Sequence, residues 1–167
     1  DGKLDGNSVH IAWHEWFSAK APLRRRYELK GTVPASLVAK AGFPSPEPFV
    51  TGPIGTTLQY QVAANGTGDV TGRIDLKGAS ADVPELDWRK EPGTDGQLQA
   101  TVKLAAGGKL VSIDFDGRSD DLRGKGSARF AGDSVLQQIA LLLLIGGKAP
   151  QLLLEANKIE HRCPRLE

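Results

Sequence analysis

A two-residue alternation of apolar and polar side chains returns along most of the chain, and it limits the possible folds more than any other feature. In residues 57–62, 70–77, 97–104 and 111–116, apolar residues occupy every second position, apart from Gly72. Successive side chains of a β-strand point to opposite faces, so each stretch predicts a strand with one apolar and one polar face. Apart from Ala100, the apolar side chains of these stretches are Leu58, Tyr60, Val62, Val70, Ile74, Leu76, Leu98, Val102, Leu104, Val111, Ile113 and Phe115.

Short turn signals separate the alternating stretches. Asn65-Gly66 and Asp95-Gly96 each precede a predicted strand, and the 20 glycines and 10 prolines of the chain fit a fold with many turns. Strands joined by turns rather than by helical crossovers form antiparallel sheets. With weaker alternation in residues 9–13, 23–29 and 122–130, the sequence predicts a mainly β fold, a curled antiparallel meander of six or seven strands.

Two segments break the alternation. Residues 34–42 predict one short helix, because Pro34 suits a first helical turn and Gly42 a C-terminal cap. Residues 134–147 space their apolar side chains as a helix would, but their leucine-rich part reads equally well as a buried strand, so both interpretations stay open.

We therefore predict a sheet domain over residues 1–133 and a helical or strand tail over residues 134–167. The chain contains no methionine and ends in Leu166-Glu167. We expect it to be a fragment of a longer protein whose last residues are vector-derived.

The apolar face of such a sheet has to be buried, because a sheet with one apolar face is stable only when that face packs against another structural element. One short helix and one ambiguous segment cover only part of it. Either the sheet curls over into a closed core, or part of the face stays open as a groove. The sequence leaves both alternatives open, and only the second implies an apolar ligand.

No set of residues predicts catalysis or metal binding. His10 and His14 lie on an alternating stretch, where four residues span about 13 Å, too far to share one ion. Cys163 stands near His161 without an identifiable orienting partner. The net charge of +1 does not favour nucleic acid. We expect no enzyme activity, no cofactor, no metal site and no nucleic-acid partner.

Four basic residues are candidate contacts for anionic lipid headgroups. Arg24 and Arg26 belong to a run of three arginines and share one face of a predicted strand. Arg89 and Lys90 follow Trp88 in a polar segment, residues 84–96. That segment itself predicts a strand end and connector, with Trp88 at the rim of the sheet and the next strand starting at residue 97.

Three stretches carry a family resemblance: IAWHEWF at 11–17, YELKG at 27–31 and, most specifically, PELDWRKEPG at 84–93. Together they resemble the AsmA-like envelope proteins of Gram-negative bacteria (the AsmA, TamB and YhdP group), and more narrowly the middle region of the YhdP-type members. The resemblance covers residues 8–132.

The resemblance implies a long, curled β-sheet in the periplasm whose apolar concave face is a groove, anchored in the inner membrane by a helix outside these residues. Such proteins are associated with phospholipid movement between the two membranes and with outer-membrane integrity, and no catalytic residues are attributed to them. The expected ligand is a phospholipid or another acyl-chain lipid, and the groove would be lined by the apolar side chains given above. The alternative is a scaffold module of the envelope that binds proteins through its sheet edges, which also favour self-association.

Overall fold

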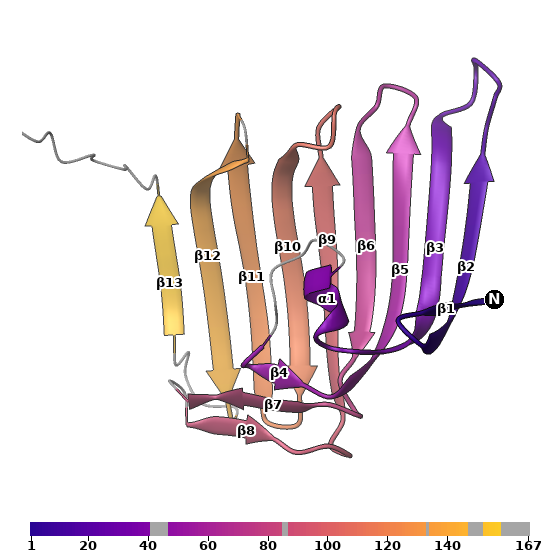
Figure 1. Cartoon of the computed structure of the whole chain (residues 1–167). Coiled ribbons are helices and arrows are strands. Elements are labelled where there is room, and N and C mark those ends of the chain that lie inside the picture. The colour runs from indigo at the N-terminus through magenta and orange to yellow at the C-terminus, as the bar shows by residue number, and fades with distance from the viewer. Residues whose placement is uncertain (41–46, 85–86, 133, 147–151, 158–167) are drawn as a thin grey trace, which may run out of the picture.

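One large antiparallel sheet dominates the computed structural model, which describes residues 1–40, 47–84, 87–132, 134–146 and 152–157 (Figure 1). Ten strands form this sheet in the order β1-β2-β3-β5-β6-β9-β10-β11-β12-β13, and three short strands form a second sheet in the order β4-β7-β8. The strands of the large sheet are β1 Gly2–Leu4, β2 Asn7–Glu15, β3 Leu23–Pro34, β5 Pro53–Ala63, β6 Gly68–Asp75, β9 Gly96–Leu104, β10 Leu110–Ser119, β11 Leu122–Ala131, β12 Val135–Ile145 and β13 Leu152–Asn157. The remaining elements are the helix α1 Leu37–Lys40 and the strands β4 Val50–Thr51, β7 Ser80–Val83 and β8 Trp88–Lys90.

The connections explain the meander. Tight hairpin turns join most neighbouring strands, and the Asn65-Gly66 turn has Gly66 at φ +83°, a conformation that favours glycine. Two connections are longer: the β3–β5 connection carries α1 and β4, and the β6–β9 connection carries β7 and β8. The predicted mainly β, antiparallel meander is confirmed. The sheet stays open, because β1 and β13 stand at its two ends.

For residues 134–147 the sequence left both a helix and a strand open, and the structure has a strand over Val135–Ile145. β12 pairs with β11 along its whole length, for example Leu141 with Gly126, so ladder hydrogen bonds to a neighbouring strand outweigh the helical spacing of its leucines. The sheet therefore continues beyond residue 133. The predicted helix is present but short, and the end of its predicted range, 41–42, lies outside the described residues.

The alternating register sorts the side chains into two faces. In-register partners of antiparallel strands point to the same side, so each row of partners belongs to one face. We call one face the apolar face and the opposite one the polar face. One row of the apolar face runs through Ile11, Leu29, Leu58, Gly72, Ala100, Phe115, Gly126 and Leu141. The next runs through Trp13, Tyr27, Tyr60, Val70, Val102, Ile113, Ala128 and Ile139.

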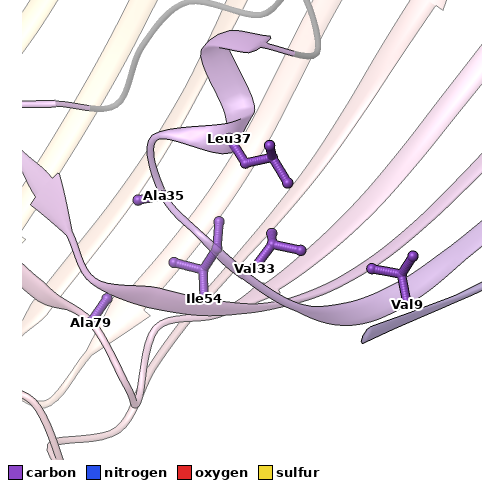
Figure 2. Close-up of a cluster of buried hydrophobic side chains, with 6 residues drawn as sticks. All are labelled: Val9, Val33, Ala35, Leu37, Ile54 and Ala79. Carbon is purple, nitrogen blue, oxygen red and sulfur yellow. The ribbon is translucent and has the colours of Figure 1, made fainter. Parts of the chain in front are cut away.

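The buried core lies at one end of the apolar face, which we call the base. There α1 and its flanking segment pack onto the ends of β2, β3 and β5 (Figure 2), and the small sheet lies along the same end (Figure 1). The buried side chains of this cluster are Val9, Val33, Ala35, Leu37, Ile54 and Ala79. The two rows named above lie beyond the base and form what we call the upper face.

Candidate functional site

The upper face is an apolar surface on which no described segment packs. Every buried apolar side chain of the described residues belongs to the base or to the small sheet. On the upper face Trp13 is 67% exposed and Ile11 51% exposed, and Leu58, Tyr60 and Phe115 are only partly buried. The same strands that build a core at the base thus leave apolar side chains in solvent farther along.

Large side chains of this face lie flat over glycines of the neighbouring strand. A Cβ added to Gly126 would lie 2.5 Å from the ring of Phe115, and one added to Gly72 would lie 2.8 Å from Cδ2 of Leu58. Tyr60 covers Gly68 in the same way, with 2.9 Å from its Cε2. Pairing a large residue with a cross-strand glycine shields the glycine backbone. These three side chains therefore lie close against the sheet.

The extent of the upper face sets it apart from ordinary surface. Its rows cross the eight strands from β2 to β12, which at about 4.8 Å per strand spacing makes it about 34 Å wide. Two such rows form a patch of roughly several hundred Å², a size that in soluble proteins marks a site for a ligand, a partner or a membrane.

Most of the predicted lining residues share the apolar face. The register places ten of them there: Leu58, Tyr60, Val62, Val70, Ile74, Leu98, Val102, Leu104, Ile113 and Phe115. Of these, Ile74 lies at the base end of the face and, like Leu76, packs against the buried cluster, so both residues belong to the core. Val111 lies in a β-bulge between Leu110 and Ser112, and Leu110 replaces it as the partner of Leu104.

The face also contains residues that the predicted lining omitted. On its N-terminal side these are Ile11, Trp13, Tyr27 and Leu29, whose alternation was visible in the sequence. On its C-terminal side they are Ala128, Ile139 and Leu141. β12 gave no alternation signal, because Leu142 and Leu144 make its other face apolar as well.

The arginine run is divided between the two faces. Arg26 pairs with His14 and Gln61 on the polar face, and its guanidinium lies 5.7 Å from the Trp16 ring centroid. Arg26 therefore lies on the face opposite the predicted groove residues. Arg24 lies at a register shift. Arg25 is the one on the side of the apolar face, and its Nε lies 3.3 Å from Oε1 of Glu15.

Lys90 was predicted at the surface, but the structure buries it. It is 2% exposed, and its ammonium donates to the backbone oxygens of Ala79, at 2.8 Å, and Glu91, at 3.1 Å. Lys90 therefore fastens the small sheet and offers nothing to a headgroup. Arg89 is exposed, but both Nε and Nη2 donate to Oδ2 of Asp82, at 3.1 and 2.6 Å, and this carboxylate raises the pKa of Arg89.

The segment 84–96 is a structural element, as the sequence indicated, but its centre is the strand β8 and β9 begins at Gly96. Trp88 is 8% exposed, and its Nε1 donates to Oδ1 of Asp121 at 2.9 Å. This bond ties the small sheet to the β10–β11 turn. Nearby, Lys77 Nζ lies 2.9 Å from Asp95 Oδ1. The pair raises the pKa of Lys77 and lowers that of Asp95.

A hollow of about 470 Å³ lies over β9, β10, β11 and β12. On each of these strands, the hollow is lined by one residue of the apolar face and by the two residues next to it in the sequence, which belong to the polar face. The hollow therefore lies between two rows of polar-face side chains. Its polar lining residues are Gln99, Thr101, Asp114, Asp116, Lys125 and Ser127. Arg129 holds Asp114 at 2.9 Å. The hollow therefore lies behind the upper face.

The predicted lack of a metal site rested on His10, His14, His161 and Cys163. His10 Nδ1 lies 3.0 Å from Oδ1 of Asp1, and the His14 ring lies 6.1 Å from that of Trp16. His161 and Cys163 lie outside the described residues, as do Leu166-Glu167. Within the described ranges there is no group of three or more His, Cys, Asp or Glu residues that could hold a metal ion. No helix in that part of the chain is long and apolar enough to cross a membrane.

No protein-family model matches the chain, and neither a curated protein nor a solved structure matches it. The resemblance to the AsmA-like envelope proteins accordingly stays a prediction from the sequence. The upper face is thus the feature of the described residues that bears most on function.

Proposed function

We propose that the chain is a non-enzymatic segment of a periplasmic, inner-membrane-anchored AsmA-like protein, whose upper face shields phospholipid acyl chains during transport between the inner and outer membranes. One observation supports this most: two rows of apolar side chains cross eight strands, and no described segment packs on them. Outer-membrane integrity would depend on that transport.

The expected strength of such an interaction suits transfer. Burying a CH₂ group contributes about 0.8 kcal/mol. An open face covers only one side of a chain, so about ten CH₂ groups would gain about 4 kcal/mol, which corresponds to a Kd of about 1 mM. A lipid would thus be held weakly, without contacts specific for its headgroup. Weak binding lets the lipid slide along the face and leave it.

The test compares two charges placed back to back on β9. Val102 lies on the upper face and Thr101 on the polar face of the same strand, so Val102→Glu and Thr101→Glu add the same charge to opposite sides. With phospholipid added above the expected Kd, we expect it bound to the parent chain and to Thr101→Glu, and lost from Val102→Glu, by native mass spectrometry with extraction of the bound lipid. A folded parent without lipid, or equal lipid in both variants, would reject the proposal.

A second candidate, a scaffold that binds proteins through its edge, is favoured by the free edge of β2. Leu4 and Asn7 flank a two-residue turn in β1–β2, so every second residue of β2 from Asn7 onward turns its backbone groups outward. β1 pairs no farther than Val9, so Ile11 and Trp13 lack a strand partner within the described ranges.

The edge can pair with a strand of another protein or of a second copy. Trp13→Pro removes one outward N–H, and sedimentation velocity should then show less self-association than in the parent. Unchanged assembly, or lipid retained by the parent, would count against the scaffold.

A further inference from the structure

The β2–β3 hairpin tip, residues 13–26, gathers exposed aromatic and basic side chains. Phe17 is 88% exposed and Trp13 67% exposed, and Lys20 is exposed in the same loop. In Figure 1 this loop rises at the end of the sheet opposite the small sheet. Phe17 therefore makes no contribution to the core, and its ring is accessible to an apolar partner outside the chain.

Charge is concentrated at this tip. It holds four basic residues, Lys20 and the run Arg24-Arg25-Arg26, against the single acid Glu15, while the whole chain has a net charge of only +1. The Trp16 ring centroid lies 5.7 Å from the Arg26 guanidinium and 6.1 Å from the centroid of the His14 ring. Basic residues beside indole and phenyl rings match the boundary of an anionic bilayer, where phosphates meet acyl chains.

The tip is continuous with the upper face. Trp13 pairs with Tyr27 in the upper of its two rows, and the Tyr27 ring stacks on that of Tyr60 at 5.9 Å. The base end of the same face is closed by the core around Ile54. A bilayer at the tip would therefore meet the open end of the face.

We propose that the β2–β3 hairpin tip docks onto an anionic phospholipid bilayer. Phe17 and Trp13 enter the boundary between headgroups and acyl chains, while Lys20, Arg24 and Arg25 contact phosphates. This deepens the proposed function, because docking places the open end of the upper face at a source or acceptor of lipid. The docking itself rests on the tip alone.

Vesicle co-sedimentation of the full 167-residue chain tests it, with phosphatidylcholine vesicles that contain or lack phosphatidylglycerol. We expect binding to the anionic vesicles that weakens as salt rises. Lys20→Ala should lower the partition coefficient about fivefold, and Phe17→Ser about tenfold or more. The matched controls are Arg118→Ala and Phe49→Ser, which change an exposed cation and an exposed phenylalanine away from the tip, and both should bind as the parent does.

Docking is overturned if the folded parent ignores anionic vesicles, binds neutral ones equally well, or binds as tightly after Phe17→Ser. Equal competition by a soluble polyanion such as heparin would also overturn the assignment to a bilayer. Lipid extraction separates this proposal from the preceding one. A chain that carries lipid but ignores vesicles loses only the docking, and one that docks through Phe17 but carries no lipid loses only the lipid-shielding face.

Discussion

The base and the upper face are built by the same strands, yet one is a core and the other a surface. In β5, Ile54 is 3% exposed at the base, whereas Leu58, four residues farther on the same face, is only partly buried. The difference comes from the connections. Within the described residues, only the β3–β5 and β6–β9 connections carry extra elements, α1 with β4 and β7 with β8, and these elements lie at the same end of the sheet.

Alternation in a strand therefore predicts that the strand has an apolar face, but it does not predict whether other elements bury that face. At the base, polar contacts also hold the covering elements in place. Lys90 donates a hydrogen bond to the backbone oxygen of Ala79 and Trp88 donates one to Asp121. Lys77 forms an ion pair with Asp95. No described element performs that role for the upper face. Stability should consequently depend on the base, and ligand binding on the upper face.

The largest effect should come from truncating the base. Ile54→Ala removes buried methyl groups and leaves a cavity, so the free energy of unfolding should fall by about 3 kcal/mol. Ile11→Ala makes the same change at a side chain that is 51% exposed, and should cost less than about 1 kcal/mol. Urea denaturation of both variants measures the contrast. Equal losses would show that the two regions do not differ as described.

A second test concerns the large-on-glycine packing of the upper face. Gly126→Ala places a Cβ 2.5 Å from the Phe115 ring and 3.0 Å from the backbone oxygen of Ala140, so it should cost about 2 kcal/mol through overpacking. In a Phe115→Ala background the cost should shrink. Gly2→Ala, with no atom within 4 Å of its new Cβ, is the control. A loss that is independent of Phe115 would contradict the packing described.

Removing the indole bond between the small sheet and the β10–β11 turn should have a smaller effect. Trp88→Phe keeps most of the buried ring but removes the 2.9 Å bond to Asp121, at a cost of about 1 kcal/mol. Asp121→Ala should cost a similar amount, and the double variant less than the sum. Trp13→Phe, on the upper face, should leave thermal stability unchanged. Fully additive losses would mean that the bond does not stabilise the base.

The smallest expected effect is pH-dependent and concerns the exposed Lys77–Asp95 pair. Lys77 lowers the folded-state pKa of Asp95 below its ordinary 3.8, so the pair stabilises the fold above that pH and stops doing so as Asp95 protonates. The pKa of Lys77 is raised above 10.5, so the stabilisation also ends at high pH. Asp95→Asn should unfold slightly more easily than the parent at neutral pH, with the gap closing below about pH 4. A gap that persists in acid would exclude this pair as its cause.

Much of the sheet could be predicted because strand alternation and Asn-Gly or Asp-Gly turns are local signals. The bulge at Val111 could not, since a single extra residue leaves the pattern of its neighbours intact. β12 was ambiguous because both of its faces are apolar. The burial of Lys90 depends on backbone oxygens from Ala79 and Glu91, which only the tertiary fold brings together.

The sequence predicted which face of the sheet holds the candidate site, but it did not predict how far the site extends along that face. Ten of the lining residues share the apolar face as their alternation indicated. The assignment of Ile74 and Leu76 to the core depends on where the inserted elements pack, which strand patterns do not encode. The openness of the upper face is likewise a property of connections, and no pattern within the strands specifies it.

The most direct test of the account maps where an acyl chain lies. A phospholipid with a photoreactive group in its acyl chain would be crosslinked to the full chain, and the adducts located residue by residue by mass spectrometry. The account predicts adducts at upper-face positions such as Tyr60, Val102 and Phe115, and none at Thr101 on the polar face or Ile54 in the base. Adducts divided evenly between Val102 and Thr101, or concentrated at Ile54, would contradict it.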